Sequence, residues 1–130
     1  MKHEELTKKI IGAFYNVYNS LGYGFLEKVY ERAMLLELLD MNINVKSQQK
    51  VSVYYKDRLV GDYYSDLIVE DSVICELKAQ ESLSLADETQ LINYLKATDL
   101  ETGIVFNFGK KPEFRRKVFD NSQKRIIHNP

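Results

Sequence analysis

Cysteine, histidine and long apolar runs are scarce in this 130-residue chain. Its single cysteine, Cys75, excludes an internal disulfide framework and any metal site built from several cysteines of one chain. No apolar run approaches the roughly 20 residues that a membrane helix needs, and the first residues lack the apolar core of a signal peptide. The sequence therefore predicts a cytoplasmic protein that does not span a membrane.

Net charge is also small, because 18 basic and 19 acidic side chains leave a formal charge of -1. The average conceals an asymmetry: residues 110–130 carry seven basic side chains and only two acidic ones. A basic segment of this kind would suit a phosphate backbone. It would equally suit a solvated edge strand whose lysines discourage aggregation. Charge alone leaves both interpretations open.

Length and composition indicate a single globular domain over residues 1–130, since 45% of the side chains are hydrophobic and 28% are charged. Apolar residues recur three or four positions apart over residues 6–21, which is the pattern of an amphipathic helix. Gly22 and Gly24 interrupt this pattern, and a second helical pattern then runs to about residue 40. The two helices are expected to form one hairpin-like unit.

The period changes to two at Val45, which predicts a strand to about Tyr55. Two further strands are expected over residues 59–69 and 73–78, joined by a tight turn at residues 70–72. A strongly apolar strand follows over residues 102–108.

A helix separates these last two strands. Ser84 and Asp87 form a capping-box pattern that opens a helix running to about Thr98. Phe114–Phe119 and Arg125–Ile127 are candidates for additional edge strands. The element order predicts an α/β domain with two N-terminal helices and a mixed central sheet that contains one crossover helix.

Two acidic residues flank the turn at residues 70–72. If that turn is a three-residue loop, Asp66 faces Glu76 across the hairpin with Cβ atoms roughly 4.5–5.5 Å apart, and Lys78 shares a face with Glu76. Like charges so placed need a raised pKa or a cation between them, and carboxylates on a rigid sheet suit Mg²⁺. A two-residue turn would place the carboxylates on different faces, and a solvated sheet face is the structural alternative.

An aspartate followed by Glu-x-Lys on the next strand resembles the PD-(D/E)XK phosphodiesterase superfamily, whose fold is restriction-endonuclease-like. More narrowly, residues 24–30 read Gly-Phe-Leu-Glu-Lys-Val-Tyr, which resembles the motif that names the GxxExxY proteins. Further ordered motifs match this family at residues 64–69, 74–79, 90–98 and 107–109. The resemblance covers about residues 4–119. Two positions depart from the family pattern: Asp87 stands where a histidine is frequent, and Ser65 where a basic residue is common.

The resemblance implies a metal site and a catalytic lysine. Asp66 and Glu76 would bind Mg²⁺ or Mn²⁺, with the backbone carbonyl of Leu77 as a possible third ligand. Lys78 would orient the attacking water, favour its deprotonation and offset charge on the transition state.

Two side chains of the third helix are further candidates. Gln90 and Tyr94 are four residues apart, so they share a helix face and could touch substrate or the catalytic lysine. A helix cap, a strand-end hydrogen bond or core packing would explain them equally well. Asn93 is the weaker candidate because it points about a quarter turn away. Tyr30, from the motif, reads more readily as packing than as chemistry.

An acidic residue on the second helix completes the predicted site. Glu27 occupies the position from which superfamily members often reach the metal directly or through water. The alternative is ordinary surface charge, with Glu27 beside Arg32 or Lys28 beside Glu31 on the helix.

The resemblance thus implies a metal-dependent nuclease, or nuclease-like phosphodiesterase, that acts on DNA. The main alternative is a catalytically silent module that keeps the fold and binds nucleic acid or a protein partner. A regulatory protein with no nucleic-acid role is a third possibility, which the acidic first 109 residues would suit. Such small domains often act as dimers, so a homodimer is left open.

Overall fold

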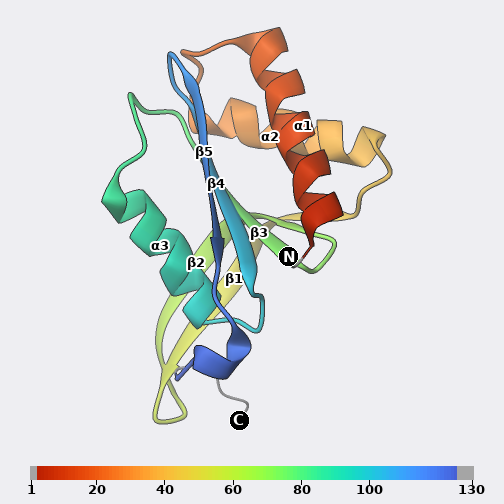
Figure 1. Ribbon diagram of the computed structural model, residues 1–130. Helices are drawn as coiled ribbons and strands as arrows, with labels where there is room; N and C mark the ends of the chain where they lie inside the picture. The colour runs from red at the N-terminus through yellow and green to blue at the C-terminus, as the bar shows by residue number, and fades with distance from the viewer. Residues whose placement is uncertain (1–2, 126–130) are drawn as a thin grey trace.

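The computed structural model of the protein describes residues 3–125. Two helices come first, then three strands, a third helix and two more strands (Figure 1). In chain order the elements are α1 (Glu4–Leu21), α2 (Glu27–Asp40), β1 (Val45–Tyr55), β2 (Arg58–Val69), β3 (Val73–Lys78), α3 (Leu85–Lys96), β4 (Thr102–Phe108), β5 (Pro112–Val118) and a short 3-10 helix, η1 (Asn121–Gln123). This order confirms the α/β prediction, including the two N-terminal helices.

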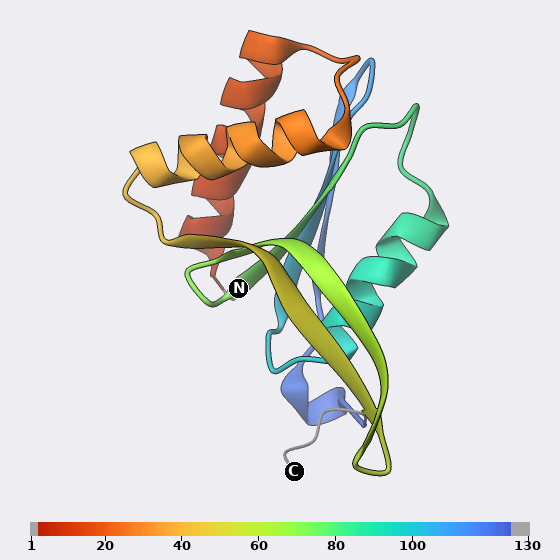
Figure 2. The same cartoon turned by 180° about the vertical axis from the view of Figure 1, so that it is seen from behind.

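The five strands form one mixed sheet in the order β1-β2-β3-β4-β5. Every neighbouring pair is antiparallel except β3 and β4, which are parallel because α3 carries the chain back between them. Helices α1 and α2 cover one face of the sheet and α3 covers the other (Figures 1 and 2). Strands β3 and β4 are buried almost throughout, so their carboxyl ends are firmly held places for functional side chains.

The apolar stripe of α1 enters the larger of two hydrophobic cores. Ile10, Phe14 and Val17 are buried there. The ring of Phe14 stacks on Phe106 of β4 with centroids 4.6 Å apart and meets Phe108 edge-on at 4.9 Å. These aromatic contacts fasten α1 across the centre of the sheet.

Tyr30 holds the connection between α1 and α2. Its hydroxyl donates to the Gly22 carbonyl at 2.7 Å and accepts from the Phe25 N–H at 3.2 Å, while Gly22 takes a φ of 68° that favours glycine. The Tyr30 ring is fully buried and stacks on Phe108 with centroids 4.1 Å apart. Tyr30 is therefore a packing residue, and its hydroxyl fixes the loop that leads into Glu27 at the start of α2.

Strands β1 and β2 form a long hairpin that extends beyond the rest of the sheet (Figure 2). β2 pairs with β1 along most of its length but with β3 only from Leu67 to Val69. The distal part is consequently a two-stranded ribbon. At the other end of β2, residues 70–72 form the predicted three-residue turn, in which the Ser72 N–H donates to the Val69 carbonyl at 2.9 Å.

The predicted capping box opens α3. Ser84 Oγ accepts from the Asp87 N–H, and the Asp87 carboxylate accepts from the Ser84 N–H. The helix ends at Lys96, slightly earlier than predicted. A Cβ on Gly103 of β4 would lie 2.6 Å from a methyl of Leu91, so this glycine allows α3 to pack closely on the sheet.

Strand β5 confirms the first of the two candidate edge strands, although it begins at Pro112 and ends at Val118. Of the second candidate, Arg125 lies outside any strand and residues 126–127 lie outside the described residues.

Several basic side chains of the C-terminal segment form ion pairs or hydrogen bonds with other parts of the fold. Lys117 lies 2.6 Å from Glu88 of α3, and Arg115 lies 3.9 Å from the same carboxylate. The Lys124 amine donates to the carbonyls of Thr98 and Leu100. These contacts give part of the segment a structural role.

Candidate active site

The candidate site lies where β2 and β3 part. The ladder between them runs from Val69–Val73 to Leu67–Cys75, which is the predicted register. It stops one pair before Asp66 and Glu76, so the prediction that these two form the next ladder pair needs correction. Instead, Asp66 Oδ2 accepts from the Leu77 N–H at 2.8 Å, and Glu76 Oε2 accepts from the Asp66 N–H at 3.0 Å. Each carboxylate therefore replaces a ladder hydrogen bond on the opposite strand.

The β1 side of Asp66 is irregular as well. Gln48 lies opposite Asp66 but is missing from the ladder, and it has a left-handed φ of 51°. Its amide Nε2 is 3.5 Å from Asp66 Oδ1. Asp66 is therefore released from regular pairing on both sides. Irregularities of this kind cluster at functional sites, where they aim a side chain out of the sheet.

Burial and mutual repulsion shift the pKa values of both carboxylates. Glu76 is 4% exposed, and burial together with the charge of Asp66 raises its pKa to about 8, against the opposing effects of the Asp66 N–H and Lys78. Burial also raises the pKa of Asp66; the Leu77 N–H opposes this shift and the charge of Glu31 adds to it. The sequence predicts that paired carboxylates here need either a raised pKa or a cation between them. The raised pKa of Glu76 meets the first of these two conditions.

These shifts predict that the metal-free protein loses stability as pH rises. The pKa of Glu76 is higher in the folded state than its ordinary 4.5, so the protonated form stabilises the fold. That contribution is complete below about pH 4.5 and is lost up to about pH 8, at a cost on the order of 5 kcal/mol. Urea unfolding in EDTA from about pH 5.5 to 8.5 measures it. Glu76→Gln is expected to flatten the curve, and an unchanged slope in that variant would contradict the assignment.

Lys78 follows Glu76 on β3 and contacts α3. Its Nζ donates to Gln90 Oε1 at 3.2 Å, and Gln90 Nε2 in turn donates to the Tyr94 hydroxyl at 3.4 Å. The predicted pair on one helix face is thus brought to the lysine, with Gln90 in direct contact and Tyr94 one bond further. Burial, and then the charges of the two carboxylates, raise the pKa of Tyr94 to about 12, so its hydroxyl stays protonated and can donate.

Helix α2 brings two glutamates toward Asp66. Glu27, the predicted residue, is exposed and acts on Asp66 through charge. Glu31 is one turn further, is 9% exposed and raises the pKa of both site carboxylates. Its Oε2 accepts from Gln48 Nε2 at 2.9 Å, and the same amide reaches Asp66.

Interpreting Glu31 as ordinary surface charge is therefore wrong. The contact with Lys28 exists, at 4.0 Å, but the carboxylate faces inward. The signal that points to Glu31 is its spacing, because a residue four positions after Glu27 shares its helix face.

We expect Glu31→Gln to weaken divalent-metal binding about tenfold, because replacing a group that surrounds the ligands of a metal commonly has an effect of this size. Glu27→Gln is expected to have a smaller effect. The amide retains an oxygen for Gln48, so what changes is mainly the charge near Asp66. Calorimetric titration of both variants with Mn²⁺ measures the difference. A larger loss in Glu27→Gln would reverse the order of the two glutamates.

The arrangement as a whole sets two desolvated carboxylates and a lysine at the edge where β2 and β3 separate, with α2 and α3 on either side. Comparison with known families identifies the superfamily of this chain. A family profile described as the PD-(D/E)XK nuclease superfamily matches residues 4–117. The chain belongs to the PD-(D/E)XK nuclease superfamily. The narrower resemblance to GxxExxY proteins stays a prediction that rests on the sequence motifs.

Among solved structures, this superfamily member is similar to the crystal structure of SSO0001, with a TM-score of 0.57 and 13% sequence identity. The likeness covers 72% of this chain and 50% of that one, so the chain spans half the length of that structure. At this identity the likeness shows the fold alone. A search of curated proteins found no match.

Nucleases of the PD-(D/E)XK superfamily generally use divalent metals, so the fit of the donor set matters. Within residues 3–125 no three His, Cys, Asp or Glu side chains converge on a point that could hold a metal ion. The two carboxylates Asp66 and Glu76 nevertheless offer hard oxygen donors, and each uses only one oxygen for a backbone N–H. A cation between them would relieve the repulsion that raises the pKa of Glu76. The donor chemistry therefore fits a hard divalent cation.

In the part of the chain that the structure describes, no helix is both long and apolar enough to cross a bilayer.

Proposed function

We propose that this chain is a metal-dependent nuclease that hydrolyses phosphodiester bonds in DNA. The observation that carries the proposal is the convergence of Asp66, Glu76 and Lys78 at the parting of β2 and β3 in a member of the nuclease superfamily. Asp66 and Glu76 would hold Mg²⁺ or Mn²⁺, with the Leu77 carbonyl as third ligand. The bound ion would supply Lewis-acid charge at the phosphoryl group.

The residues around these ligands have separable roles. Lys78 would present its ammonium to the developing negative charge and favour deprotonation of the attacking water. Gln90 supports this role because its Oε1 accepts from Lys78 Nζ and so positions the amine. Tyr94 would steady Gln90 from the opposite side through its hydroxyl. Glu27 and Glu31 would add negative charge that attracts the cation.

Phosphate contacts are proposed for the turn between β4 and β5. Parallel pairing brings the carboxyl ends of β3 and β4 to the same sheet edge, so this turn lies on the same side as Lys78. Lys110 lines a cavity there together with Ala79, the residue after Lys78, and Lys111 follows it in the turn. Backbone contacts by these lysines would give affinity that falls with salt and depends little on sequence.

The test combines Mg²⁺ or Mn²⁺ titration by calorimetry with a plasmid and oligonucleotide cleavage assay on the same sample. Metal binding accompanied by metal-dependent cleavage is expected. Metal binding with no cleavage of any nucleic acid would instead favour the catalytically silent module. A protein that binds no divalent metal would remove the proposed site and leave the fold.

A further inference from the structure

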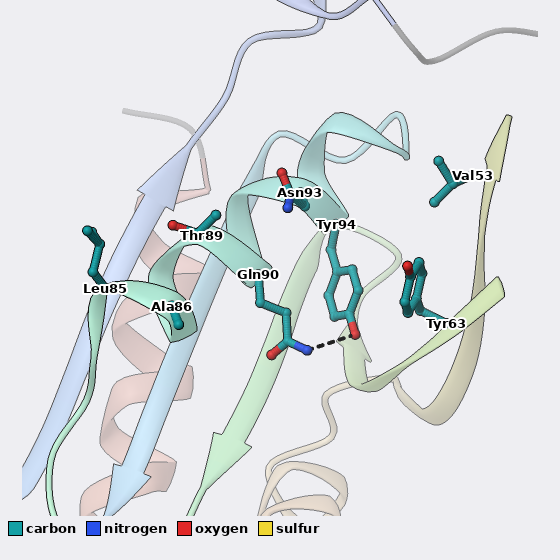
Figure 3. A pocket seen from close by; sticks show the side chains of 8 residues that line it. All are labelled: Val53, Tyr63, Leu85, Ala86, Thr89, Gln90, Asn93 and Tyr94. Atoms are coloured by element: carbon teal, nitrogen blue, oxygen red, sulfur yellow. Dashed lines mark hydrogen bonds between the residues drawn. The ribbon is translucent and has the colours of Figure 1, made fainter. Parts of the chain in front are cut away.

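A cavity of about 640 Å³ lies beside the candidate active site, between the β1–β2 ribbon and α3 (Figure 3). This volume is within the roughly 300–1,000 Å³ typical of small-molecule sites. Val53 and Tyr63 form the ribbon wall, and Gln90, Asn93 and Tyr94 lie on the helix wall. The cavity is therefore large enough for a ring-sized group that comes from outside.

The walls offer aromatic surface and neutral polar groups. Tyr63 is 50% exposed, and its ring lies 5.9 Å from that of Tyr94 at an interplanar angle of 47°. The amides of Gln90 and Asn93 provide donors and acceptors along the helix side. None of the lining residues carries a formal charge. Such walls suit a flat, uncharged group with hydrogen-bonding edges, and they do not suit a phosphate.

Gln90 links the cavity to the catalytic lysine. Its amide lines the cavity, while its Oε1 accepts from Lys78 Nζ at 3.2 Å. Only the side chain of Gln90 would therefore separate a group in the cavity from a scissile phosphate that contacts Lys78. In a nucleic acid, the flat uncharged group attached next to a phosphate is a nucleobase.

We propose that this cavity is a subsite for one unpaired nucleobase next to the scissile phosphate. The proposal rests on the nuclease function proposed above. A base inside a duplex is stacked on both sides and paired along its edge, so only a single-stranded or extruded base can enter. The preferred substrate is accordingly DNA with unpaired nucleotides at the cleavage position, and Tyr63 supplies the stacking surface.

The test compares Tyr63→Ala with Tyr64→Ala. The two tyrosines are neighbours on β2 and are about equally exposed, at 50% and 56%, but successive strand residues face opposite sides and Tyr64 does not line the cavity. The probe is a 20-nucleotide oligonucleotide with 2-aminopurine at one position, prepared as single strand, as blunt duplex and as a duplex in which that nucleotide alone is unpaired. Fluorescence quenching reports stacking of the base, and anisotropy reports affinity.

We expect the affinity for single-stranded DNA, and for duplex with one unpaired nucleotide, to be at least about tenfold higher than the affinity for blunt duplex. Tyr63→Ala is expected to abolish the quenching and to weaken this binding about 5- to 150-fold, the range seen when a stacking aromatic is removed. Tyr64→Ala is expected to match the wild type. An abasic site at the unpaired position should cost the wild type the same affinity, because the proposal assigns the contact to the base.

The subsite and the nuclease function fail in different ways. If the wild type cuts duplex and unpaired DNA equally and the two tyrosine variants behave alike, the subsite is overturned and the nuclease function stands. Loss of quenching only in Tyr63→Ala, with no cleavage of any substrate, would support the subsite and overturn the nuclease function. A wild type that neither binds nor cuts any of the probes overturns both.

Discussion

Glu76→Gln and Asp66→Asn are each expected to lower DNA cleavage by about a thousandfold or more while leaving the protein folded. A metal ion contributes several kcal/mol to transition-state stabilisation, and a neutral amide is a poor ligand for Mg²⁺. The fold persists because an amide oxygen can still accept the backbone N–H that each carboxylate now binds. Alanine at either position would instead leave a backbone donor without its partner, which itself destabilises the fold.

The measurement is single-turnover cleavage at saturating Mg²⁺, with calorimetric titration and circular dichroism on the same samples. Asp62→Asn is the matched control, because Asp62 lies on the same strand but pairs with exposed Lys50 at 3.7 Å, away from the site. We expect the control to bind metal and cut DNA as the wild type does. Full activity in either site variant would overturn the assignment of these carboxylates as ligands.

Lys78→Met is expected to reduce kcat about 100- to 1,000-fold without a comparable loss of metal affinity. The effect is this large because a donor aimed at developing charge acts mainly in the transition state. Methionine keeps most of the length of the side chain and removes only the ammonium and its contact with Gln90. A variant that loses metal binding and cleavage together would show that Lys78 shapes the metal site and does not act on the reaction itself.

Lys46→Met is the control for this experiment. Lys46 is an exposed lysine of β1 that pairs with Asp71 at 3.2 Å, next to the turn that follows β2. Cleavage rates of the two variants at fixed Mg²⁺, with metal dissociation constants measured separately, divide the effect into catalysis and binding.

The outline of this fold is readable because local signals agree with the tertiary structure. Period-two apolarity from Val45, the Ser84–Asp87 capping box and the apolar run at residues 102–108 all became the elements they predict. The register of β2 on β3 followed from the length of one turn. The apolar strand around Glu76 makes its charge conspicuous, so the sequence alone singles out the two carboxylates as candidates.

What the sequence missed depends on deviations from regular geometry. Sheet rules treat Asp66 as a ladder residue, whereas both of its neighbouring ladders break there and side chains take over the backbone bonds. Glu31 was missed because its inward direction depends on how α2 crosses β1, which helix periodicity alone does not specify. Similarly, the cavity beside Gln90 needs the twist of the β1–β2 ribbon toward α3, which no local pattern encodes.

β2 pairs with β1 along most of its length but with β3 only near one end, so parts of the molecule differ in local stability. Backbone amides of β3 and β4 sit between paired strands and beneath helices on both faces, so they are expected to exchange with deuterium only when the whole domain opens. Beyond Asp66, by contrast, the ribbon pairs only with itself, and its tip around residues 55–58 can fray without disturbing the core. Glu76 thus stands on the most slowly opening part of the molecule, and Asp66 stands at the boundary of that part, where the pairing of β2 with β3 ends. Tyr63 stands on the two-stranded ribbon, which can open and close by itself. Such opening would let DNA with unpaired nucleotides reach the cavity while Glu76 and Lys78 stay in place.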